Sequence, residues 1–159
     1  MFQFLADTSY AAWVRESWGW PIALTFHAFC NAIVVGLIFI IGMRLLGLFR
    51  TIPYTSLNRL IPVIWVGFVC QVLSGFTLWV SKPDKYMASG MFEVKFTFVI
   101  IGAVLTWYFA DTLKRESAAW EASGKVSSRG LRFVGVTALA WAAVLTTGRL
   151  TAYLGSLYS

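Results

Sequence analysis

The sequence predicts an all-α integral membrane protein, an antiparallel four-helix bundle with a short N-terminal helix at the membrane interface. Of its 159 residues, 58% are hydrophobic and 13% are charged, whereas an average soluble domain has about 25% charged residues. The mean hydropathy is +0.72. Because a chain of this length cannot bury so much apolar surface in one water-soluble core, we expect a single transmembrane domain over residues 1–159.

Four apolar segments are long enough to span a bilayer, since about 20 helical residues cover the roughly 30 Å hydrocarbon layer. The first has no charged residue between Ile22 and Met43, and the second has none between Ile61 and Val80. The third and fourth hold Lys95 and Arg149 near one end, where long side chains reach the interface. We expect spans over residues 21–48, 58–81, 91–113 and 131–157.

The segment before the first span has apolar and polar residues at near-helical spacing. It places Trp13, Trp18 and Trp20 where aromatic side chains favour the headgroup region. We therefore expect a helix that lies in the membrane interface. Pro21 suits the first turn of the helix that follows.

The basic residues predict the orientation. One side of the membrane has eight of them, in or beside the first and third connections: Arg44, Arg50, Arg59, Lys114, Arg115, Lys125, Arg129 and Arg132. The other side has three: Arg15, Lys82 and Lys85. The positive-inside rule places the first side in the cytoplasm and both termini outside. We expect the protein in the inner membrane of a bacterium, so that both termini face the periplasm. Basic residues confined to the ends of apolar runs do not form a nucleic-acid-binding face.

Three ionisable residues lie at similar depth on the outer side. His27 is about 9 Å, Lys95 about 6 Å and Arg149 about 12 Å from the outer ends of their helices, at 1.5 Å per residue. An ionisable residue inside a membrane is a functional candidate. A neutral imidazole ligates iron, and the propionates of a haem need cations. Asn31 follows His27 at i+4 and could orient it. The candidate cofactor-binding residues are therefore His27, Asn31, Lys95 and Arg149, with His27 as the metal ligand.

His27 is the only histidine, so one chain cannot supply two histidine ligands. A haem here would be five-coordinate, would take a Met or Lys as its sixth ligand, or would be shared with a partner. The alternative interpretation is a structural or quinone-contacting histidine. Gln71 could bridge helices or line a cavity, while Ser74 and Gly75 indicate close helix packing.

Two further patterns concern packing and anchoring. Ala28, Ala32 and Gly36 form a small-residue stripe at four-residue spacing, which is typical of close helix packing. Arg44 and Asp111, near the cytoplasmic ends of the first and third spans, could pair across the bundle, but we interpret Arg44 as an interface anchor.

Several motifs together resemble a family of small bacterial membrane proteins of unassigned function. They are His27 in the first helix, Arg44–Leu45–Leu46–Gly47, Gly75–Phe76–Thr77–Leu78–Trp79, Tyr86, Phe92 with Lys95, and Gly148–Arg149. The resemblance covers about residues 15–155. More distantly, the chain is similar to the haem-b-binding protoporphyrinogen oxidases of the four-helix bacterial type. That similarity implies haem b at His27 with Lys95 nearby. It does not carry the enzymatic activity over, because the C-terminal ending of those enzymes is absent.

We therefore expect a haem-b-associated membrane subunit that transfers electrons near the outer face, between a periplasmic donor and a quinone or a larger complex. One alternative is a cofactor-free accessory subunit of a respiratory or photosynthetic complex, and another is a porphyrinogen-oxidising enzyme. The sequence leaves open whether the protein is an enzyme. Its expected partners are the lipid bilayer and other membrane subunits or further copies of the chain, and not nucleic acid.

Overall fold

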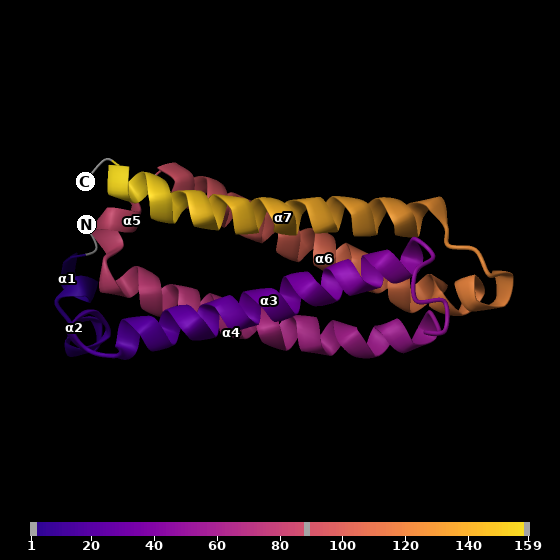
Figure 1. Cartoon of the computed structure of the whole chain (residues 1–159), viewed down its shortest axis with the longest axis horizontal. Coiled ribbons are helices and arrows are strands. Elements are labelled where there is room, and N and C mark those ends of the chain that lie inside the picture. The colour runs from indigo at the N-terminus through magenta and orange to yellow at the C-terminus, as the bar shows by residue number, and fades with distance from the viewer. Residues whose placement is uncertain (1–2, 88–89, 158–159) are drawn as a thin grey trace.

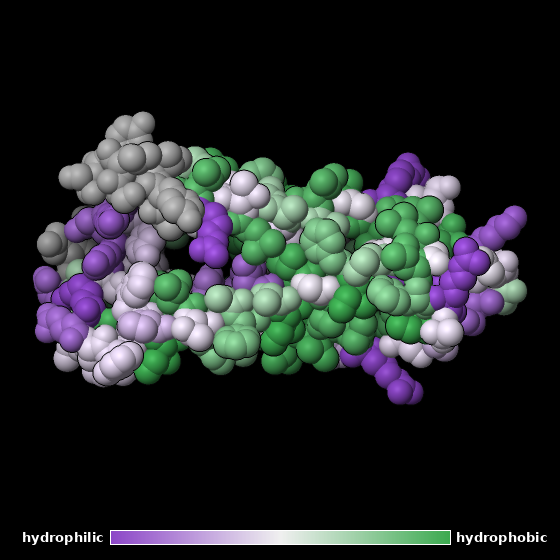
Figure 2. Space-filling model, viewed as in Figure 1, coloured by the Kyte–Doolittle hydropathy of each residue, from purple (hydrophilic) through white to green (hydrophobic). Residues whose placement is uncertain are grey.

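The fold is a bundle of four long antiparallel helices, seen in a computed structural model that describes residues 3–87 and 90–157 (Figure 1). These helices are α3 (Gly19–Leu45), α4 (Leu60–Ser81), α6 (Gly90–Ser123) and α7 (Ser128–Leu157). Each is long and apolar enough to cross a membrane. Figure 2 shows hydrophobic residues over the middle of the bundle and hydrophilic residues towards both ends. The predicted fold class is confirmed.

Shorter elements lie at the two ends of the bundle. Both described chain ends lie at one end (Figure 1), together with three short helices: α1 (Gln3–Ala6), α2 (Ser9–Glu16) and α5 (Pro83–Met87). We call this the outer end. The 3₁₀-helix η1 (Thr55–Arg59) and the α6–α7 connection lie at the opposite end. The described residues of the bundle hold no strand.

The helices pack as two pairs. α3 lies along α4 and α6 lies along α7, while α3 also packs on α7 and joins the pairs. α4 and α6 are not major packing partners, and Figure 1 shows them diverging towards the outer end. Trp141 fills the centre at 1% exposure and donates through Nε1 to the Thr106 hydroxyl at 2.9 Å. Gly102 makes room for it, because a Cβ there would lie 3.2 Å from Trp141 Cε2.

Two helix ends differ from the sequence expectation. The first span ends at Leu45 rather than at residue 48, because Gly47 adopts a φ of +97°, which helix residues do not. The third helix continues ten residues beyond 113, to Ser123. Its polar extension is stabilised by tertiary contacts: Trp120 packs edge-on against Tyr54, and the Glu121 carboxylate accepts from the Tyr54 backbone N–H.

The predicted N-terminal helix forms over Ser9–Glu16 and is attached to the outer end of α4. The Thr8 hydroxyl caps it by accepting from the Ala11 N–H at 3.2 Å. Arg15 donates to the carbonyl oxygen of Ser81, the last residue of α4, at 3.1 Å. Trp13 and Trp18 remain exposed, at 52% and 78%, as a helix at the headgroup level requires.

The interpretation of Arg44 as an interface anchor is wrong. Its side chain is buried, at 5% exposure, and its guanidinium lies 3.8 Å from the centre of the Tyr54 ring. Its Nε donates to the Ile52 carbonyl. Because the connection folds back over the end of α3, Arg44 joins these two segments instead of reaching the headgroups.

Candidate functional site

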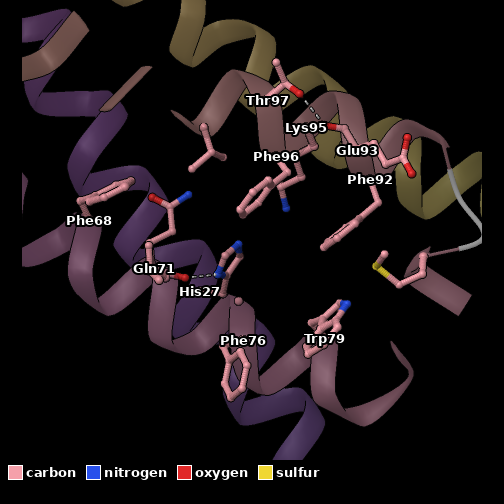
Figure 3. Close-up of a pocket in the computed structure, with 14 residues that line it drawn as sticks. His27, Phe68, Gln71, Phe76, Trp79, Phe92, Glu93, Lys95, Phe96 and Thr97 are labelled. Carbon is pink, nitrogen blue, oxygen red and sulfur yellow. Dashed lines mark hydrogen bonds between the residues drawn. The ribbon is translucent and has the colours of Figure 1, made fainter. Parts of the chain in front are cut away.

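A cavity of about 560 Å³ lies between α4 and α6 near the outer end of the bundle (Figure 3). This is within the range of about 300–1,000 Å³ that accommodates a small molecule or cofactor. Its lining is largely aromatic, with Phe68, Phe76 and Trp79 from α4 and Phe92 and Phe96 from α6. Phe76 and Phe96 are exposed on the bundle surface, so the cavity opens sideways, where the bilayer would lie.

His27 enters the cavity from α3. Its Nδ1 lies 3.1 Å from the Gln71 carbonyl oxygen and 3.0 Å from the Ser74 Oγ. A carbonyl oxygen only accepts, and the Ser74 hydroxyl donates its own hydrogen to the Cys70 carbonyl at 2.8 Å. These contacts favour the neutral tautomer in which Nδ1 carries the ring proton and donates it to the Gln71 carbonyl. Nε2 is left with a free lone pair, and Figure 3 shows this nitrogen turned into the cavity.

Gly75 lets the imidazole lie close to α4. A Cβ at this position would be 3.2 Å from His27 Cε1 and 3.5 Å from Nδ1. Ser74 and Gly75 thus do more than the close packing that the sequence indicates. Ser74 accepts from the imidazole and Gly75 provides the space for its ring.

Gln71 has two roles, in its main chain and in its side chain. Its carbonyl orients His27, while its side-chain Nε2 donates to Asn31 Oδ1 at 2.9 Å. Gln71 is 5% exposed and lines the cavity. Its Oε1 has no hydrogen-bond partner among the described residues. Gln71 therefore both bridges two helices and lines a cavity, as the sequence suggests.

Lys95 enters from α6, on the opposite wall. Its stem passes Gly148 of α7, where a Cβ would lie 3.5 Å from Lys95 Cε and 3.6 Å from Nζ. In the part of the chain that the structure describes, the amine has no hydrogen bond or ion pair. Glu93 lies at the exposed rim of the cavity but forms no ion pair with Lys95. Figure 3 shows the amine directed towards His27.

The structure thus brings two of the four candidate residues to one cavity. His27 and Lys95 both line it. Asn31 does not contact the imidazole through any hydrogen bond and instead holds the Gln71 side chain. Arg149 is exposed on α7 and does not line the cavity. Arg149 lies at a depth similar to that of His27 and Lys95, but its side of α7 does not face the cavity that those two residues line.

The sequence did not indicate two features of the site, the aromatic lining of the cavity and the group that orients His27. The aromatic residues of the lining cannot be distinguished in the sequence from other lipid-facing aromatic residues. The group that orients His27 is a main-chain carbonyl, which every residue has. Tyr86 of α5 does not line the cavity, but its ring centre lies 5.6 Å from that of Phe92, which does. Burial raises the pKa of the Tyr86 hydroxyl above its ordinary value.

The chain matches no protein-family model, no curated protein and no solved structure. The resemblance to small bacterial membrane proteins therefore stays a prediction. Within residues 3–87 and 90–157, no group of three or more His, Cys, Asp or Glu side chains could hold a metal ion.

Proposed function

We propose that this protein is a haem-b-binding subunit of the bacterial inner membrane that carries electrons near the outer face. The observation that carries the proposal is the orientation of His27. The Gln71 carbonyl holds Nδ1–H at 3.1 Å, and the opposite nitrogen offers its lone pair to an aromatic cavity. A backbone carbonyl on the far nitrogen of a metal-bound histidine fixes the ring and makes it a stronger ligand.

The residues around the cavity suit haem b. His27 would ligate the iron, and the aromatic side chains would contact the apolar macrocycle. Haem b would supply a one-electron redox centre. Lys95 also lines the cavity and brings an amine to it. Three other cations towards this end are exposed: Lys82, Lys85 and Arg149. Arg149 would contact a propionate only if the haem extended beyond the cavity.

The location of the cavity supports a role in electron transfer. It lies at the end of the bundle with three basic residues, which the positive-inside rule places outside. Because its opening lies between α4 and α6, a quinone in the bilayer or a second membrane subunit could approach the site from the side. A water-soluble donor in the periplasm could approach from the outer end.

The reduced-minus-oxidised absorption spectrum of the protein, purified in detergent from haem-replete cells, tests the proposal. We expect a b-type spectrum with about one haem per chain. His27→Ala should lose it, while Thr25→Ala, at an exposed position of α3 outside the cavity, should keep it. Circular dichroism and gel filtration would show that both variants fold. A colourless wild-type protein would reject the proposal and favour a cofactor-free accessory subunit.

A further inference from the structure

The amine of Lys95 is an unusual group for its position. It lies in a helix that can span the membrane, lines an aromatic cavity, and has no hydrogen bond or ion pair among the residues that the structure describes. Lys95 is close enough to the helix end for its amine to reach the interface, but it lines the apolar cavity instead, where an ammonium group is costly unless a partner compensates its charge. Among the residues that the structure describes, none supplies that partner, and a group bound in the cavity is one that could.

The direction of the Lys95 side chain indicates which kind of bound group its amine would contact. Figure 3 shows the Lys95 amine and the Nε2 nitrogen of His27 pointing towards one another, from α6 and α3 respectively. A glycine stands beside each of them: Gly75 next to the imidazole, and Gly148 next to the Lys95 stem. Two nitrogen-bearing side chains, one from α3 and one from α6, thus line the same cavity.

A second role for Lys95, binding a propionate, fits the geometry less well. Propionates are charged and favour the polar edge of the membrane. The exposed cations Lys82, Lys85 and Arg149 lie towards the outer end, whereas the Lys95 amine is directed inwards, to the imidazole. A nitrogen that coordinates a metal gives up its proton first, and a neutral amine carries no charge into the apolar cavity.

We infer that Lys95 Nζ is the second axial ligand of the haem, on the face opposite His27. This inference rests on the proposed haem-binding function. Both axial positions are then filled by the protein, which leaves no open position for a gas or a substrate. Such a centre exchanges electrons without binding the reactant at the metal, as an electron-carrying subunit requires.

Lys95→Arg is the decisive variant, because arginine is also long and basic but does not lose its proton, so it cannot ligate a metal. Spectra of the purified haem-loaded protein should show a six-coordinate, low-spin wild type that does not bind CO when reduced. Lys95→Arg and Lys95→Ala should both become high-spin and bind CO, with at least a tenfold gain in the CO-bound fraction. Lys85→Arg, at an exposed position in α5, is the matched control and should match the wild type.

The outcomes separate the two proposals. A haem-loaded Lys95→Arg protein that stays low-spin and excludes CO overturns the ligand assignment and leaves the haem-binding function intact. A reduced wild-type protein that already binds CO also overturns the ligand assignment and leaves the haem-binding function intact. A wild type without haem overturns both. If Lys95→Ala fails to fold, the Lys95→Arg spectrum still decides, because arginine retains a long basic side chain but cannot ligate a metal.

Discussion

The imidazole of His27 in α3 lies directly against Gly75 in α4. A Cβ at position 75 would be 3.2 Å from His27 Cε1, closer than ordinary contacts allow. The absence of a side chain at this one position therefore sets how deeply the ring lies against α4 and where its cavity-facing nitrogen points.

Gly75→Ala should therefore weaken haem binding without unfolding the bundle. The added methyl group would push the imidazole away from the Gln71 carbonyl, and we expect about a tenfold loss of haem affinity, which is about 1.4 kcal/mol. Titration of the apoprotein with haem would measure it. Gly36→Ala is the matched control, because a Cβ at Gly36 would meet no atom within 4 Å. Equal affinities of the two variants would contradict the packing argument.

A second prediction concerns the hydrogen bond between Asn31 and Gln71. Its donor and acceptor are 2.9 Å apart, and Gln71 is buried with its Oε1 already unpartnered in the described structure. Asn31→Ala would leave the whole amide without a partner, at a cost of about 1–3 kcal/mol. Gln71→Leu combined with Asn31→Ala should cost less than the sum of the single variants.

Denaturant unfolding in detergent would measure this coupling, and Thr25→Ala provides an exposed α3 control. Hydrogen bonds between membrane helices contribute about 0.6 kcal/mol on average and at most about 1.7 kcal/mol in double-mutant cycles. Strict additivity of the two substitutions would show that the Asn31–Gln71 bond does not join α3 and α4.

The sequence predicts where the helices of this fold lie in the chain better than which side of each helix packs against its neighbours. Span positions follow from counting charge-free apolar residues, because only a long helix satisfies its backbone in lipid. In a bilayer both the packed and the lipid-facing sides of a helix are apolar, so periodicity does not separate them. For this reason the Ala28, Ala32 and Gly36 stripe was expected to pack, yet Ala28 and Ala32 are exposed and Gly36 faces open space.

The same limit applies to the candidate site. Depth along the helices correctly brought His27 and Lys95 together, because antiparallel spans place residues of equal depth at one level. Depth does not give the rotation of a helix about its axis, and Arg149 lies outside the cavity. The Gln71 carbonyl that orients His27 is a main-chain group, and every residue type has one. Its role depends on where α4 lies against α3.

A third prediction concerns the central hydrogen bond between α6 and α7. Thr106→Val keeps the shape of the side chain but leaves the buried Trp141 Nε1–H, now 2.9 Å from the hydroxyl oxygen, without its acceptor. We expect a loss of about 1 kcal/mol in the free energy of unfolding. Thr146→Val is the control, because Thr146 is exposed and its hydroxyl donates to the Ala142 carbonyl of its own helix. If Thr106→Val and Thr146→Val have the same free energy of unfolding, the Thr106–Trp141 hydrogen bond makes no net contribution to stability.

The last prediction tests the orientation, on which the outer location of the cavity depends. Eight basic residues adjoin the two connections at one end of the bundle and three lie at the other, so the first end should face the cytoplasm. In a Cys30→Ala, Cys70→Ala background, Lys85→Cys in α5 should react with a membrane-impermeant maleimide in cells with a permeabilised outer membrane. Arg50→Cys in the first connection should react only after lysis. The reverse pattern would place His27 and Lys95 near the cytoplasmic face, and any electron donor or acceptor of the site would then be sought there.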